Sequence, residues 1–230
     1  MNPITRWQVF PDAEQLAAHA AALILDGARA AITARGLFRL VLAGGRTPLA
    51  VYARLATAPA DWPRWQVYFG DERCLPVGDP GRNDAQARRV WLDHVPIPPA
   101  NIHAIPAELG AGRAAEQYAA TLQAVPEFDL VLLGLGEDGH TASLFPGQPT
   151  GDAPGSPDVL AVHGAPKPPP ERVTLSAARL ARARRVVFLV TGPDKRAAVA
   201  AWRRGADLPA RRIASGGEVE VLLDAAADAK

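Results

Sequence analysis

Cysteine is nearly absent: Cys74 is the only one among 230 residues. A single thiol excludes a disulfide within the chain, so nothing indicates an oxidising compartment and we expect the protein to be cytoplasmic. The first residues lack the basic segment, apolar core and small-residue cleavage site of an export signal. No uninterrupted apolar run approaches the roughly 18 residues that a membrane-spanning helix needs. We therefore predict neither export nor a membrane span.

A strong net charge is also absent, because 25 basic and 24 acidic residues leave a formal charge of +1. This balance excludes the broad basic surface that would indicate a nucleic-acid partner, so any anion site must be local. No metal-ligand motif, repeat or heptad pattern occurs. With 48% hydrophobic and 21% charged residues, the composition is that of a soluble globular protein. The length predicts one domain over residues 1–230.

Short apolar runs alternate with stretches of helical character along most of the chain. The runs expected to form strands are 7–10, 37–42, 65–70, 128–133, 159–162, 172–175, 185–190 and 219–222. The stretches expected to form helices are 11–35, 47–55, 83–94, 111–122 and 193–204. This alternation predicts an α/β fold of three layers, α/β/α, with a mostly parallel sheet covered on both faces. Ligands of such sheets bind at the carboxyl ends of the strands.

A glycine turn joins a predicted strand to a predicted helix where residues 42–48 read LAGGRTP. Gly44 and Gly45 let the backbone approach an anion closely, and the N–H groups at the start of the helix would attract a phosphate. The turn matches neither the Rossmann nor the Walker A pattern, which speaks against a dinucleotide or triphosphate ligand. A purely structural tight turn is an equally good interpretation of this segment.

Charged residues follow the predicted strand 65–70, where residues 69–73 read FGDER. Asp71, Glu72 and Arg73 form a cluster more typical of a site than of a core, and Arg73 could pair with a phosphate bidentately. The alternative is a surface ion-pair group that closes the strand. Asn83 fits either a polar substrate contact or a helix N-cap, and by itself it favours the cap.

The most informative segment follows the apolar run 128–133, where residues 134–146 read GLGEDGHTASLFP. Imidazole can take a proton from water near neutral pH, and a nearby carboxylate orients it and raises its basicity. The sequence therefore predicts His140 as a general base, with Asp138 as the orienting acid. The alternative is that residues 138–139 form only a turn and that His140 begins the next segment.

The other titratable candidates are less specific. Lys195 lies at the start of a predicted helix, where a positive charge opposes the helix dipole, and so indicates an anionic partner. A solvated lysine is the alternative. The remaining histidines show no acidic partner or metal-ligand spacing in the sequence, and we expect packing or surface roles for them: His19, His94, His103 and His163.

Taken in order, these segments resemble the 6-phosphogluconolactonases. The matching segments are AGGRTP at 43–48, GDER at 70–73, GLGEDGHTASLFP at 134–146, PERVTL at 170–175, and TG at 191–192 with Lys195. The histidine segment is highly specific, whereas the glycine turn is shared with the related glucosamine-6-phosphate isomerases and deaminases. Together the segments span almost the whole chain.

The resemblance implies an isomerase/CoA-transferase-like fold and hydrolysis of 6-phospho-D-glucono-1,5-lactone to 6-phospho-D-gluconate, the second step of the oxidative pentose phosphate pathway. It implies no cofactor and no metal, a small-molecule substrate as partner, and a monomer or weak homo-oligomer. By position, His140 would activate water and Asp138 would orient it. The residues that would contact the substrate or its phosphate are Gly44, Gly45, Arg46, Thr47, Asp71, Arg73, Asn83, Arg172 and Lys195.

One departure and two alternatives accompany this resemblance. Relatives often carry serine at the position of Arg46, which puts a hydroxyl contact to phosphate in doubt. The deaminating isomerases typically read DGHIAFNEP where residues 138–146 read DGHTASLFP, so Phe145 stands in place of their acid. A deaminase-like isomerase is therefore one alternative. A non-catalytic sugar-phosphate-binding protein is the other, although the chain keeps the predicted base.

Overall fold

A seven-stranded parallel sheet forms the centre of the protein, of which a computed structural model describes residues 5–153, 155–213 and 218–229. The strands have the order β1-β10-β9-β6-β2-β3-β5, and each neighbouring pair is parallel. Their bounds are β1 (Thr5–Phe10), β2 (Phe38–Leu42), β3 (Trp65–Phe69), β5 (Ile102–His103), β6 (Phe128–Gly134), β9 (Ala183–Val190) and β10 (Glu218–Asp224).

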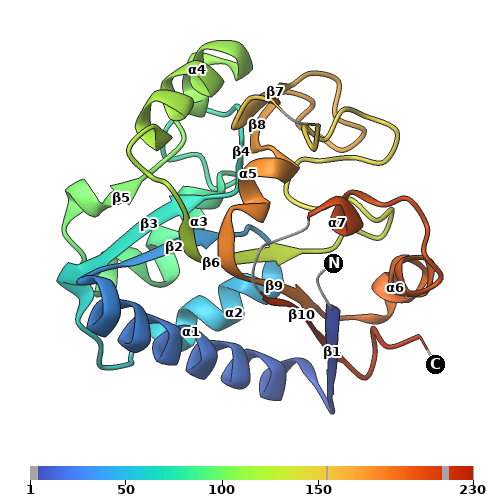
Figure 1. The fold of residues 1–230 in the computed structure, drawn as a ribbon, viewed down its shortest axis with the longest axis horizontal. Coiled ribbons are helices and arrows are strands. Elements are labelled where there is room, and N and C mark those ends of the chain that lie inside the picture. Colours follow the sequence, from blue (N-terminus) through green and yellow to red (C-terminus); the bar gives the residue numbers. More distant parts are fainter. Residues whose placement is uncertain (1–4, 154, 214–217, 230) are drawn as a thin grey trace.

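Helices cover both faces of this sheet. Their bounds are α1 (Ala13–Arg35), α2 (Arg46–Leu55), α3 (Asn83–Val90), α4 (Ala111–Leu122), α5 (Ala177–Ala181), α6 (Arg196–Arg203) and α7 (Pro209–Arg212). Figure 1 shows α1 and α2 beneath the sheet and α4 and α5 above it. The predicted three-layer α/β/α class with a mostly parallel sheet is confirmed.

A second, smaller sheet lies on the upper side and was not predicted (Figure 1). Its antiparallel strands have the order β4 (Asp71–Arg73), β8 (Arg172–Leu175) and β7 (Val159–Val162). Three residues are too few to show alternation, so the sequence pattern could not identify β4. Through this sheet, residues just after β3 meet residues one hundred positions later in the chain.

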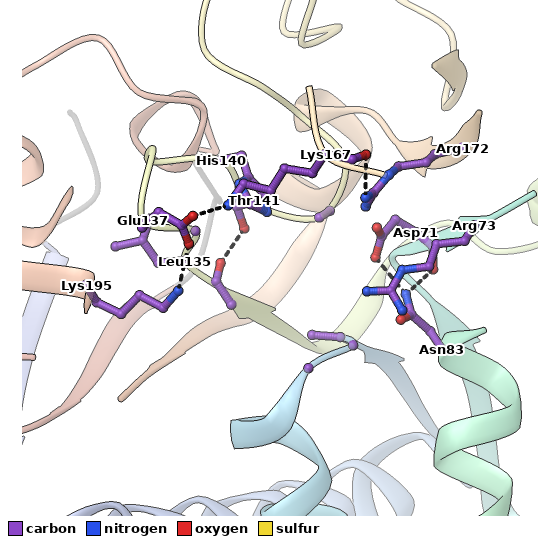
Figure 2. Close-up of a pocket in the computed structure, with 16 residues that line it drawn as sticks. Asp71, Arg73, Asn83, Leu135, Glu137, His140, Thr141, Lys167, Arg172 and Lys195 are labelled. Carbon is purple, nitrogen blue, oxygen red and sulfur yellow. Dashed lines mark hydrogen bonds and ion pairs between the residues drawn. The ribbon is translucent and has the colours of Figure 1, made fainter. Parts of the chain in front are cut away.

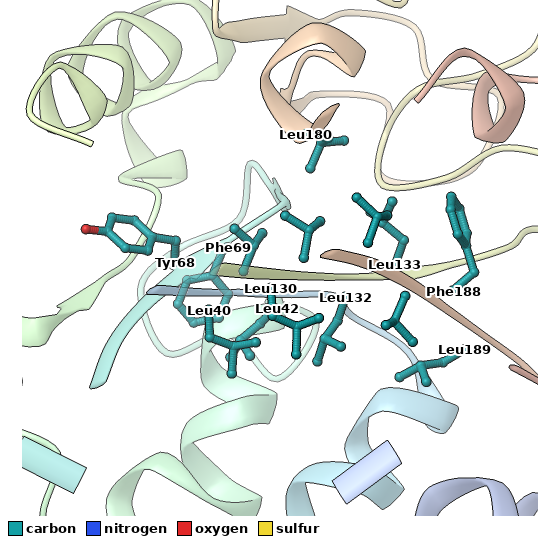
Figure 3. Close-up of a cluster of buried hydrophobic side chains, with 14 of the residues drawn as sticks. Leu40, Leu42, Tyr68, Phe69, Leu130, Leu132, Leu133, Leu180, Phe188 and Leu189 are labelled. Atoms are coloured by element: carbon teal, nitrogen blue, oxygen red, sulfur yellow. The ribbon is translucent and has the colours of Figure 1, made fainter. Parts of the chain in front are cut away.

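Side chains of the central strands alternate between the two helical layers, as Figure 3 shows. Leu133 and Phe188 point toward Leu180 of α5, whereas Leu132 and Leu189 point to the opposite face. All four strand residues are buried. The continuous apolar runs in β6 and β9 thus reflect burial on both faces, which is why they lack a two-residue period.

Helix α1 has clear end signals in the sequence. The Asp12 carboxylate accepts a hydrogen bond of 2.8 Å from the backbone N–H of Gln15, and Gly36 ends the helix with φ of 79°. With 23 residues, α1 is long and apolar enough to cross a membrane if length and composition alone are considered. Core helices of soluble proteins meet the same criterion, and Leu16 and Ile24 of α1 are fully buried within this fold.

Two predicted helices are shorter than expected. The helix expected over 83–94 ends at Val90, because Trp91 leaves the helical region with φ of −150°, and Leu92–His94 form a separate 3₁₀ turn. The helix expected over 193–204 begins as a 3₁₀ turn at Pro193–Lys195 and becomes α6 only at Arg196. Both differences concern element ends, where sequence signals are weakest.

Candidate functional site

The carboxyl ends of β2, β3, β6 and β9 meet at one edge of the sheet and surround a pocket of about 270 Å³. Figure 2 shows its polar side chains converging from loops that are far apart in the sequence. The lining residues are Ala43, Gly44, Gly45, Asp71, Arg73, Asn83, Gly134, Leu135, Gly136, Glu137, His140, Thr141, Ala142, Lys167, Arg172 and Lys195.

His140 and Asp138 form a hydrogen-bonded pair in the loop after β6. The distance from His140 Nδ1 to Asp138 Oδ1 is 2.5 Å, and the backbone N–H of His140 donates to the same oxygen at 3.2 Å. A carboxylate at Nδ1 favours the tautomer with its proton there, which leaves Nε2 as the basic nitrogen. Burial alone would raise the pKa of Asp138, but the hydrogen bonds from His140 outweigh it and hold this pKa below its usual value.

A tight backbone loop carries this pair. The N–H of Gly136 donates to the carbonyl of His140 at 2.8 Å, and the N–H of Gly139 donates to the carbonyl of Gly136 at 3.0 Å. Gly139 has φ of 87°, a conformation that favours glycine. The turn at residues 138–139 is therefore real, but it also presents the imidazole to the pocket, so the turn-only interpretation is insufficient.

Asp71 and Asn83 form a second polar group on the opposite side of the pocket (Figure 2). Asp71 accepts hydrogen bonds from Ser143 Oγ at 2.6 Å and from Asn83 Nδ2 at 3.1 Å. Asn83 Nδ2 also donates to the Asp71 carbonyl at 3.0 Å, whereas Asn83 Oδ1 is buried without a partner among the described residues. This oxygen faces Gly44, where an added Cβ would lie 2.0 Å away. The Asp71 carboxylate therefore offers acceptors to a hydroxyl-bearing ligand, and the Asn83 amide orients it.

The N-cap interpretation of Asn83 is wrong. Helix α3 begins at Asn83 and its N-cap position is Arg82. The buried carboxylate of Glu72 satisfies the helix start instead, because it accepts backbone N–H groups of Asn83 at 2.8 Å and Asp84 at 2.9 Å. Glu72 also accepts the N–H of Arg73 at 2.8 Å, so it holds β4 against α3. Glu72 is therefore a structural acid, unlike Asp71 beside it in the sequence.

Four cationic side chains line the pocket: Arg73, Lys167, Arg172 and Lys195. Arg172 is almost fully buried, and most of its donors are engaged: Nε with Pro169 O at 3.0 Å, Nη2 with Lys167 O and Pro168 O at 3.1 Å each, and Nη1 with Ser143 Oγ at 3.4 Å. Its guanidinium therefore anchors the loop before β8. Arg73 contacts the Gly81 carbonyl.

Lys167 is the functional candidate that the sequence analysis missed. The proline-rich segment around it, PKPPP at 166–170, lies between the strands expected over 159–162 and 172–175 and has no predicted element of its own. In the fold, Lys167 Nζ lies 2.6 Å from Glu137 Oε1 at the pocket. A lone lysine in a proline-rich loop carries no local pattern that indicates a site, so only the fold identifies it.

Arg46 and Thr47 do not line this pocket. They line an adjoining cavity at the start of α2, which shares Gly44, Gly45 and Lys195 with the pocket. Thr47 Oγ1 lies 2.7 Å from Thr191 Oγ1 at the end of β9, and Gly45 has φ of 105° at the N-cap of α2. The two cavities thus form one continuous surface along the glycine turn.

Three of the other histidines contact polar groups elsewhere in the fold. His163 pairs with Glu171 at 2.7 Å, although the sequence showed no acidic partner for it, and the pair lies outside the pocket. His94 contacts Arg89 O and His103 contacts Gln66 Oε1, both at 2.8 Å. Within residues 5–153, 155–213 and 218–229, no group of three His, Cys, Asp or Glu side chains is placed to hold a metal ion.

Comparison with known proteins gives a consistent result. Residues 11–222 match the family described as glucosamine-6-phosphate isomerases/6-phosphogluconolactonase. A curated 6-phosphogluconolactonase of Streptomyces coelicolor is 41% identical over 248 residues, which cover 99% of this chain and 95% of the relative. One of Mycobacterium tuberculosis is 38% identical and covers 97% of both chains. The crystal structure of 6-phosphogluconolactonase from Thermotoga maritima superposes with a TM-score of 0.89 at 28% identity, and the match covers 96% of this chain and all of that one.

Proposed function

The chain belongs to the family of glucosamine-6-phosphate isomerases and 6-phosphogluconolactonases, and we propose that it hydrolyses 6-phospho-D-glucono-1,5-lactone to 6-phospho-D-gluconate. This reaction is the second step of the oxidative pentose phosphate pathway. The observation that carries the mechanism is the His140–Asp138 pair, placed at a pocket that also holds four cationic side chains.

General base catalysis by His140 accounts for the chemistry. Because Nδ1 donates to Asp138, Nε2 can take a proton from a water molecule. The resulting hydroxide adds to the lactone carbonyl carbon, and the carbonyl oxygen becomes an oxyanion. The bond between that carbon and the ring oxygen then breaks, and His140 returns its proton to the leaving oxygen. These steps need no cofactor.

Substrate contacts follow from the positions of the remaining groups. The 6-phosphate binds along the glycine turn, through the N–H groups of Gly44 and Gly45 and the Lys195 ammonium, with Arg46 and Thr47 in the adjoining cavity. Asp71 accepts hydrogen bonds from sugar hydroxyls, and Asn83 orients its carboxylate. Arg73 supplies further positive charge, and Arg172 acts mainly by anchoring its loop.

A specific contact favours the lactonase over the deaminating isomerase. Phe145 stands where the isomerases carry an acid. Its ring is buried, and the centroids of the Phe145 and His140 rings are 4.9 Å apart. An apolar ring cannot take part in the proton transfers of an isomerisation.

Hydrolysis of freshly prepared 6-phosphogluconolactone, corrected for spontaneous opening, tests the proposal directly. We expect the protein to accelerate acid release in the absence of added cofactors and metal ions. Failure to exceed the spontaneous rate would contradict the proposed function. Ammonia release from glucosamine 6-phosphate would then be the next activity to measure.

Gly136→Ala is expected to lower kcat/KM for the lactone about tenfold to a hundredfold, because small displacements of catalytic groups have effects of this size. A Cβ at residue 136 would lie 2.0 Å from His140 Nδ1 and 2.6 Å from Asp138 Oδ1, so the pair would have to move. Steady-state kinetics measure the effect. Gly112→Ala in α4 is the control, since its Cβ would meet nothing within 4 Å. Equal kinetics for the two variants would contradict this account.

Lys195→Met is expected to raise KM for the phosphorylated lactone about tenfold, the scale of one lost charge-assisted contact. Turnover of unphosphorylated gluconolactone should change little, because the contact is to phosphate. The control is Arg64→Met, an exposed cation at the amino end of β3. A parallel loss on both substrates would show that Lys195 does not recognise phosphate.

We also propose that the protein acts in the cytoplasm, on a small-molecule substrate, as a monomer or weak homo-oligomer. The proposal extends to the absence of nucleic-acid and membrane partners, which the near-neutral charge supports. Light scattering across a range of protein concentrations would test the oligomeric state.

A further inference from the structure

Lysine is rare in this protein, and its placement is uneven. Of 25 lysines and arginines, only Lys167, Lys195 and Lys230 are lysines. Two of these three line the same pocket. A lysine ammonium is a compact charge with three rotatable donors, whereas a guanidinium is a rigid fork. The pocket therefore holds two ammonium groups, which can reorient their N–H donors toward anions of different shape.

Glu137 lies between these two lysines, as Figure 2 shows. Its Oε1 is 2.6 Å from Lys167 Nζ, and its Oε2 is 3.7 Å from Lys195 Nζ. The three residues come from three different loops, after β6, between β7 and β8, and after β9. A hydrogen bond from Lys167, with its charge, holds the pKa of Glu137 below the usual value. Glu137 thus lies within ion-pair distance of two ammonium groups, and Lys195 Nζ is also 2.9 Å from Asp194 Oδ2.

The two lysines are better fixed than the carboxylate. The nearly fully buried Arg172 donates hydrogen bonds to the carbonyls of Lys167 and Pro168. These bonds anchor the backbone that carries the Lys167 side chain. The side chain of Glu137 is 56% exposed, against 31% for Lys167 and 20% for Lys195. An exposed ion pair contributes little net stability, so Glu137 can turn into solvent at small free-energy expense.

We propose that Glu137 takes, between Lys167 and Lys195, the position of the substrate's phosphate, and that an incoming phosphate displaces it. This inference rests on the proposed function only for the identity of the phosphate ester. A phosphate carries close to two negative charges and three acceptor oxygens, whereas Glu137 offers one charge and two oxygens. The exchange therefore favours dianions and discriminates against monoanionic carboxylates. Lys167 becomes a second phosphate ligand beside Lys195.

Binding of inorganic phosphate, measured by titration calorimetry without turnover, tests the exchange. Glu137→Gln keeps the shape and removes the charge, and it should bind phosphate about threefold to fivefold more tightly, the range expected for removal of one exposed competing ion pair. Lys167→Met should bind phosphate about tenfold more weakly. The matched control is Glu127→Gln, since Glu127 also forms an ion pair, at 2.8 Å with Arg184, at the opposite end of β6.

The results separate cleanly. Unchanged or weaker phosphate binding by Glu137→Gln, or unchanged binding by Lys167→Met, would overturn the inference even if the lactone is hydrolysed. Tighter binding by Glu137→Gln with weaker binding by Lys167→Met would support it. That pattern would hold even if the unchanged protein failed to open the lactone, in which case only the proposed function would be wrong.

Discussion

Replacing His140 with alanine is expected to lower kcat/KM for 6-phosphogluconolactone about 10²- to 10⁴-fold, the usual contribution of a general base. The loss should fall mainly on kcat, because the imidazole acts on the attacking water and not on a distant part of the substrate. Stopped-flow measurement of acid release, corrected for spontaneous opening, gives both parameters.

His163→Ala provides a matched control for this variant. His163 also pairs with a carboxylate, Glu171 at 2.7 Å, but it is 66% exposed and outside the pocket. We expect its kinetics to remain within about twofold of the unchanged protein, since surface substitutions away from a site have small effects. If His140→Ala behaves like His163→Ala, the general-base assignment is wrong.

Asp138→Asn in the same series tests how the base is oriented. An amide at residue 138 cannot supply the negative charge that stabilises the protonated imidazole after it takes the proton from water. We expect kcat to fall about tenfold to a hundredfold with KM little changed, within the range of interactions that act only in the transition state. An increase in KM alone would place Asp138 in substrate binding instead.

Arg82→Met is expected to lower the free energy of unfolding by about 3–5 kcal/mol, because it leaves buried carboxylates without their counter-ion. The Arg82 guanidinium is 2% exposed and bonds Asp84 Oδ1 at 2.9 Å and Glu108 Oε2 at 2.8 Å. Its Nε also lies 3.9 Å from Glu72 Oε2, and its remaining donors reach two backbone carbonyls. Urea unfolding followed by circular dichroism measures the change.

The pH dependence of this loss follows from Glu72. Burial raises the pKa of Glu72 to about 7, against the lowering effect of three backbone N–H groups. An acid whose pKa is higher in the folded than in the unfolded state reduces stability as the pH rises from the unfolded pKa toward the folded one. Removal of Arg82 should raise this pKa further, so the difference between the variant and the unchanged protein should grow as the pH rises above about 7, where only the unchanged protein has Glu72 ionised.

An exposed arginine serves as the comparison. Arg54 pairs with Glu14 at 3.2 Å at the surface, and Arg54→Met is expected to change stability by less than about 1 kcal/mol. A loss of similar size for Arg54→Met and Arg82→Met would contradict the role assigned to the buried cluster. Because Arg82 and Glu72 hold α3 against β4, Arg82→Met should also weaken the placement of Asn83 at the pocket.

Much of the site could be predicted because it is local. The contact between Asp138 and His140 joins residues two positions apart, so their spacing within a glycine-rich loop already indicates the pair. The same holds for Gly45, whose φ of 105° meets the requirement of a strand-to-helix turn. The apolar run in β6 shows burial on both faces and therefore a central strand. Periodicity and short-range chemistry suffice for such features.

The contacts between segments distant in the sequence were decided only by the tertiary structure. Ser143 reaches Asp71 across 72 positions, and Asn83 turns its amide to Asp71 while Glu72 takes over the start of α3. Lys167 enters the pocket because Arg172 holds its loop. None of these contacts has a local signature, because each depends on the order of strands in two sheets. The sequence by itself determined most of the elements and the local pairing of His140 with Asp138, whereas the fold decided which distant side chains share their pocket.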